Sequence, residues 1–259
     1  MTIVLLPPSE SKVSPESGPK LNLANLAFAE LTDKRSEAIA GLIKLSSGSQ
    51  ARALSALGIS KKQEFELIRN QNLFTAATAP AWQIYSGVLF EALDAKSLTA
   101  PQLKKLCKLT YVQSALFGLV SLGDLIPAYR LSGDCVLPKI GSLPKFWASA
   151  CTELLAQESG LIIDLRSGTY TKLGPLPTES NSVIPKILQR MKSGPPKVVS
   201  HHNKATKGRI LRAIVQSKTK IRSIDDLSNI ISTLGADVEI KVPTRSSDPI
   251  ALEVVVDVL

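Results

Sequence analysis

Three short clusters of polar residues hold side chains that bind anions. They are Ser9–Lys12, Arg166–Lys172 and His201–Lys207, and each follows an apolar stretch. Lysine and arginine attract phosphate and carboxylate groups, and serine, threonine and asparagine add neutral donors. Candidate general bases are Glu10 and Glu91, while Lys12 and Lys204 are candidates for stabilising an anion or a transition state. The clusters predict an anion-binding site that is either catalytic or purely ligand-binding.

Three strands are predicted to position these clusters. Thr2–Leu6 and Leu161–Leu165 are apolar runs typical of buried strands, and the short β-branched run Lys197–Ser200 predicts another. A helix follows, because apolar residues recur at helical spacing from Ile210 to Val215. Ligands bind at the carboxyl ends of strands in open α/β sheets. If these strands are parallel neighbours, their clusters line one crevice.

Simpler interpretations of the same residues remain open. Pro7–Lys12 is also typical of a polar turn, and the lysines after residue 203 are also typical of a solvated basic helix. Glu91 faces either solvent or a cleft. Asp124 and Arg130 form either part of a site or a structural ion pair. His201 and His202 are adjacent, so at most one of them faces a cleft on an extended chain.

The composition favours an acidic partner. The 259 residues include 31 basic and 22 acidic ones, which gives a net charge of +9 and favours nucleic acid, nucleotides or phosphorylated metabolites. Cys107, Cys135 and Cys151 are widely separated and lack nearby histidines, as expected of reduced cytosolic thiols. No nucleotide-binding glycine motif or zinc motif occurs, so we expect no metal and no cofactor. With no signal peptide and no apolar run near ~20 residues, we expect a cytoplasmic protein without a membrane partner.

The remaining chain predicts helices before residue 72 and two closing strands. Residues 33–72 are helical in texture, and Leu57–Ser60 is an apolar–Gly–apolar turn. Such a turn is typical of an ordinary helical hairpin, and also of a helix-hairpin-helix element whose N–H groups bind DNA phosphates. Gly174–Pro196 is predicted to run irregularly over the surface. Val238–Val242 and Leu252–Val258 are predicted to pair as strands.

Six blocks, taken together and in order, resemble the peroxide stress protein YaaA family. They are LLPPSESK, YSGVLFEAL, FGLVSLGDLIPAYRL, KFW, IIDLRSGTYTK and SHHNKATKGRILR, spread from about Ile3 to about Ile214. The resemblance implies one compact α/β domain with a helix-hairpin-helix element beside a positively charged cleft. It also implies protection against hydrogen peroxide, limitation of unincorporated iron, and binding of duplex and branched DNA.

The resemblance adds functional positions to those from the clusters. The predicted ligand cleft then comprises Lys12, Tyr85, Glu91, Asp124, Arg130, Arg166, Ser167, Tyr170, Lys172, Lys204, Lys207 and Arg212. Further matched positions are Gly87, Tyr129 and Gly208, and the DNA hairpin comprises Gly58, Ser60, Lys61 and Lys62.

We therefore expect a single α/β domain over residues 1–259, with a central mixed, largely parallel sheet and a hairpin-containing helical region. We expect a monomeric stress-response protein that binds DNA independently of sequence. The alternative is an enzyme acting on a small phosphorylated or nucleotide-like ligand.

Overall fold

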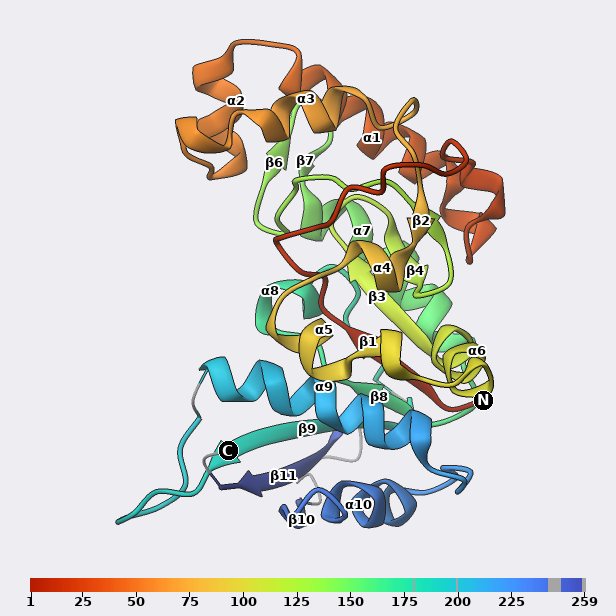
Figure 1. Ribbon diagram of the computed structural model, residues 1–259, viewed down its shortest axis with the longest axis vertical. Coiled ribbons are helices and arrows are strands. Elements are labelled where there is room, and N and C mark those ends of the chain that lie inside the picture. The colour runs from red at the N-terminus through yellow and green to blue at the C-terminus, as the bar shows by residue number, and fades with distance from the viewer. Residues whose placement is uncertain (179, 199, 242–247, 258–259) are drawn as a thin grey trace.

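A seven-stranded mixed sheet organises the molecule (Figure 1). The computed structural model describes residues 1–178, 180–198, 200–241 and 248–257, with the backbone alone for residues 200–202. The strand order is β10-β11-β9-β8-β1-β3-β4. Their bounds are β1 (Ile3–Leu6), β3 (Thr110–Ser114), β4 (Gly118–Ser121), β8 (Ile162–Asp164), β9 (Ser182–Gln189), β10 (Asp237–Lys241) and β11 (Ile250–Val256). The pairs β3–β4 and β10–β11 are antiparallel and the others parallel, which confirms the predicted α/β class and mixed sheet.

Strand β1 is the centre of this sheet. Its four residues are apolar and have no exposed surface, and it pairs in parallel with β3 on one side and β8 on the other. After β1 the next strand of this sheet is β3, which lies on one side of β1. After β8 the next strand is β9, which lies toward the opposite edge of the sheet. The boundary between β1 and β8 is therefore a topological switch point, where α/β sheets form ligand crevices.

The helices cover the sheet and extend one end of the molecule. In Figure 1, α1–α3 gather at the end remote from β9–β11, and α9 lies across the front beside α5. The helices are α1 (Thr32–Ser46), α2 (Gln50–Leu57), α3 (Phe65–Gln71), α4 (Ala81–Ile84), α5 (Val88–Leu93), α6 (Ala100–Leu109), α7 (Leu143–Ala156), α8 (Gly168–Thr171), α9 (Ser200–Gln216) and α10 (Ile224–Ser232). Two small ribbons pair β2 (Ala79–Pro80) with β5 (Leu125–Ile126), and β6 (Val136–Leu137) with β7 (Gly141–Ser142).

The region between residues 174 and 200 differs from its sequence prediction. Instead of a surface meander it contains β9, which lies between β8 and β11. Proline lacks an N–H group and so disfavours strands, but Pro185 pairs with Leu252 of β11. The pairing of β9 with β8 ends before Pro185, so no hydrogen bond to β8 is lost at this position. The strand predicted at Lys197–Ser200 was also wrong. Lys197 forms a single antiparallel bridge to Gln189 at the end of β9, but Val198 is 59% exposed and α9 begins at Ser200.

Glycine 208 sets how closely α9 approaches α5. A Cβ atom placed on Gly208 would lie 2.2 Å from the carbonyl oxygen of Leu89. That oxygen belongs to the backbone of α5 and cannot move aside as a flexible side chain would. Glycine therefore permits a helix contact that any larger residue would separate.

Replacing Gly208 with alanine is expected to destabilise the fold by about 1–3 kcal/mol, because the added methyl group overpacks the α5–α9 contact. Denaturant unfolding measures this change. Gly168→Ala is the matched control, since a Cβ there meets nothing within 4 Å. Equal stability of the two variants would contradict the close-approach argument.

Candidate functional site

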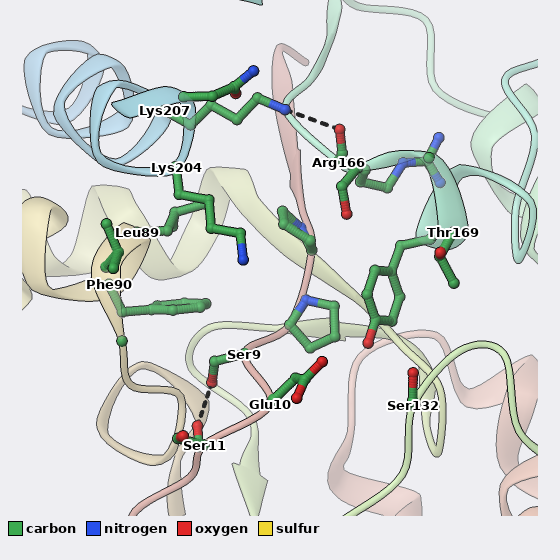
Figure 2. A pocket seen from close by; sticks show the side chains of 18 of the residues that line it. Ser9, Glu10, Ser11, Leu89, Phe90, Ser132, Arg166, Thr169, Lys204 and Lys207 are labelled. Carbon is green, nitrogen blue, oxygen red and sulfur yellow. Dashed lines mark hydrogen bonds between the residues drawn. The ribbon is translucent and has the colours of Figure 1, made fainter. Parts of the chain in front are cut away.

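A cleft of about 770 Å³ lies at the carboxyl ends of β1 and β8 (Figure 2). The loop after β1 contributes Pro7–Ser11, and the chain after β8 contributes Arg166–Tyr170. The beginning of α5 and the first half of α9 form the other sides. The cleft thus occupies the switch point, and the two polar clusters after β1 and β8 meet there as the sequence predicted.

Two lysines border the cleft from α9. Lys204 is exposed and its ammonium group extends into the cavity, whereas Lys207 is half-buried and donates from Nζ to the carbonyl oxygen of Arg166 at 3.0 Å (Figure 2). Burial lowers the pKa of Lys207, and the negative charge of Asp164 partly opposes that shift. Both side chains present cationic donors to the same space.

Carboxylates border the cleft as well. Glu10 accepts a hydrogen bond from Arg130 at 2.9 Å, and Asp134 accepts one from the Thr169 hydroxyl at 3.3 Å. In Figure 2, Glu10 and Ser132 lie across the cavity from Lys207. Sequence reasoning missed Ser132 and Asp134, because no apolar strand precedes them; their one local signal was the turn-forming Ser-Gly-Asp triplet. The cleft is consequently mixed in charge.

The guanidinium group of Arg166 is bound to the protein interior and does not face a ligand. It donates to both carboxylate oxygens of Asp164, at 2.9 and 2.7 Å. It also donates to the side chain of Gln113 at 3.0 Å and to the carbonyl of Gly174 at 2.6 Å. Arg166 is 4% exposed. The prediction that the Arg166 side chain binds an anion in the cleft was therefore wrong, although Arg166 is among the residues that border the cleft.

Lys12 lies beneath the cleft and supports its β1 loop. Its ammonium group donates to the Ser9 carbonyl at 2.7 Å and lies 4.1 Å from the centre of the Tyr129 ring. Burial, reinforced by the charge of Arg130, lowers the pKa of Lys12 to about 7. Tyr85 is buried in the same layer, where its hydroxyl bonds that of Tyr129 at 3.1 Å.

The remaining predicted cleft residues lie elsewhere. Asp124 accepts from the N–H groups of Ala27 and Ser121, which fixes a turn. Arg212 donates to the carbonyls of Leu93 and Asp94 at the end of α5. Glu91 is exposed beside a separate cavity of about 330 Å³, and Lys172 is exposed at the end of α8. Of the predicted set, the cleft is bordered by Arg166, Ser167, Tyr170, Lys204 and Lys207, together with the candidate base Glu10.

Three N–H groups at the predicted DNA hairpin are already engaged within the protein. Gly58 and Ile59 donate to carbonyls of α2, and Ser60 donates to the Gln63 side chain at 3.2 Å. Lys61 and Lys62 are exposed on a 3₁₀ turn that precedes α3. The element therefore exposes two lysine side chains, while the N–H groups of Gly58, Ile59 and Ser60 are bonded within the protein. The side chains of His201 and His202 lie outside the described residues.

Two negative findings apply to the described residues. No three His, Cys, Asp or Glu side chains are placed there to hold a metal ion. Within the same ranges, every helix is too short or too polar to cross a membrane.

A seven-stranded mixed sheet with surrounding helices and a polar cleft at its switch point defines an open α/β protein. Residues 1–235 match the family described as Peroxide stress protein YaaA. The UPF0246 protein of Corynebacterium efficiens is 42% identical over 92% of this chain and 95% of its own length. That of Streptomyces coelicolor is 35% identical over 98% of both chains. The chain belongs to the peroxide stress protein YaaA family.

Stability should rise with pH through the titration of Lys12. Its pKa falls from 10.5 to about 7 on folding, so between these values the unfolded chain binds more protons and a rise in pH favours the folded state. The difference in unfolding free energy between the wild type and Lys12→Met should grow in favour of the wild type by up to about 1.4 kcal/mol per pH unit. Urea unfolding of both proteins at several pH values measures this difference. Parallel pH profiles of stability for the two proteins would contradict the lowered pKa of Lys12.

Removing the Arg166 side chain should destabilise the fold by about 3–5 kcal/mol, because it leaves the Asp164 carboxylate buried without its partner. Unfolding of Arg166→Met tests this expectation. The double variant Asp164→Asn/Arg166→Met should recover part of the loss, since it removes the buried charge. A mild effect of Arg166→Met would show that this ion pair does not hold the β8 loop.

Proposed function

We propose that this protein binds DNA without reading its sequence and so protects it during peroxide stress, including from damage driven by free iron. The family description supports the stress context. The observation that carries DNA binding is the distribution of charge along the chain.

The positive charge is concentrated in residues 181–222. This segment contains eleven lysines and arginines and no aspartate or glutamate, whereas the rest of the chain has twenty basic and twenty-two acidic residues. The whole surplus of +9 thus arises in β9, α9 and the connections at both ends of α9. A continuous basic stretch of this kind attracts the phosphates of nucleic acid.

Several of these cations are accessible. Lys192 and Lys197 lie on the excursion between β9 and α9, which projects from the body of the molecule in Figure 1. Lys218 and Lys220 follow α9, and all four are exposed. None of the four forms an ion pair within the described ranges, in contrast to Arg190, which bonds Asp237 and Asp257. Exposed lysines without ion-pair partners break few contacts within the protein when they bind phosphate, so they are suited to contact the DNA backbone.

The hairpin between α2 and α3 supplies a second, smaller contribution. Lys61 and Lys62 are exposed at the other end of the molecule. In this proposal the helix-hairpin-helix-like region acts through these side chains. A long or branched DNA could contact both ends, while a short duplex would engage mainly the basic segment.

DNA binding should weaken steeply with salt, because each neutralised phosphate releases a counterion. Charge reversal in Lys192→Glu/Lys197→Glu or Lys218→Glu/Lys220→Glu should weaken binding about tenfold or more and reduce the salt slope by about two. Fluorescence anisotropy with unrelated duplexes at several salt concentrations measures both quantities. The same variants should leave cells more sensitive to hydrogen peroxide.

The matched control is Lys20→Glu/Lys145→Glu, which changes net charge equally at exposed positions outside the basic segment. Lys61→Glu/Lys62→Glu should weaken branched DNA more than a short duplex. Failure of the wild type to bind any duplex at low salt would refute the proposal. An equal loss in the control pair would refute the assignment to residues 181–222.

A further inference from the structure

We propose that the cleft at the ends of β1 and β8 is a binding site for a nucleoside phosphate. This site is distinct from the exposed lysines proposed to contact DNA. The shared chemistry is a phosphate attached to a sugar and a base, whether as a free mononucleotide or as the terminal nucleotide of a strand.

The position of the cleft is the first reason. The chain leads from β1 toward one edge of the sheet and from β8 toward the other edge, so the loops after these strands separate and leave a crevice. Those two loops, Pro7–Ser11 and Arg166–Tyr170, border the cleft. Its volume of about 770 Å³ lies in the range of about 300–1,000 Å³ typical of small-molecule sites.

The lysines of α9 indicate where the phosphate binds. The ammonium group of Lys207 is half-buried and bonds only to a neutral carbonyl, that of Arg166. Neither Lys207 nor Lys204 forms an ion pair with a described residue, and the carboxylate near Lys207, that of Asp164, is bonded to Arg166. A desolvated ammonium group without a counterion is unfavourable, and a bound phosphate would supply that counterion.

The opposite side of the cleft carries carboxylates, of which Glu10 is paired with Arg130, so it suits phosphate less well than the α9 side does. Glu10 and Ser132 lie there in Figure 2, and Asp134, which also borders the cleft, accepts from the Thr169 hydroxyl. Carboxylates accept hydrogen bonds from sugar hydroxyls and from the N–H groups of bases. The ligand therefore combines an anionic end that faces α9 with a hydroxyl- or N–H-bearing end that faces Glu10 and Asp134.

A fixed aromatic wall suits the base. Phe90 borders the cleft and stacks on Tyr85, with ring centres 5.4 Å apart. Tyr85 is in turn bonded to Tyr129, whose hydroxyl lies 2.7 Å from that of Ser114. Phe90 is 8% exposed and its side chain is held in place before a ligand arrives, so little conformational entropy is lost when a base contacts its accessible part. Inorganic phosphate would leave this wall unused.

Isothermal titration calorimetry with AMP, GMP, CMP and UMP tests the proposal, with adenosine and inorganic phosphate as partial ligands. At least one mononucleotide should bind with a dissociation constant below about 1 mM and at least tenfold more tightly than either partial ligand. Lys204→Ala should weaken its binding at least tenfold. Lys172→Ala is the matched control, since this exposed lysine lies near the cleft but outside it.

A second variant fills the cleft without removing a charge. Gly168 borders the cavity, and a Cβ atom added there meets nothing within 4 Å, so Gly168→Trp is expected to block nucleotide binding while leaving the unfolding temperature unchanged. Tight binding of a 5′-phosphorylated trinucleotide, but not of its unphosphorylated form, would assign the site to a strand end.

The proposal would be overturned if no mononucleotide or phosphorylated trinucleotide bound, or if Gly168→Trp bound as well as the wild type. The Lys192→Glu/Lys197→Glu protein should retain nucleotide binding. The two proposed functions can therefore fail independently.

Discussion

The buried guanidinium group of Arg166 is the constraint on which the cleft depends. The Arg166 side chain joins the end of β8 to Gln113 of β3 and to the chain after α8. The backbone carbonyl of Arg166 accepts a hydrogen bond from Lys207 of α9. An arginine placed this deeply is tolerated because Asp164 neutralises it with two hydrogen bonds. The same bonds hold the loop after β8 in the shape that borders the cleft.

Helix α9 connects the two proposed activities. Gly208 lets it approach the backbone of α5, and this contact holds Lys204 and Lys207 beside the cleft. The basic residues at either end of the helix face solvent instead. One acid-free segment thus presents charge to two environments, a half-enclosed cavity and an open surface. The half-buried Lys207 suits a compact anion, whereas lysines on the open surface are screened by salt and suit any polyanion.

The motif residues and the residues that line the cleft are different sets. Lys12, Asp124 and Arg212 lie in the motifs that carry the family resemblance, yet each bonds backbone groups that hold a loop or a helix end. Sequence patterns reveal which residues a fold requires, but a polar side chain that fixes a loop and one that touches a ligand have the same composition. Distinguishing them requires knowing which side of the loop faces the cavity.

The sequence by itself determined the α/β class, the buried strands β1 and β8, and the polar clusters that follow them, because apolar runs and their breaks are local properties. It also determined the charge of the segment around α9. Only the tertiary structure decided that β9 fills the slot beside β8, that Ser132 and Asp134 complete the cleft, and that Arg166 is withdrawn from it. These outcomes depend on pairings between residues far apart in the chain, and no local pattern encodes such pairings.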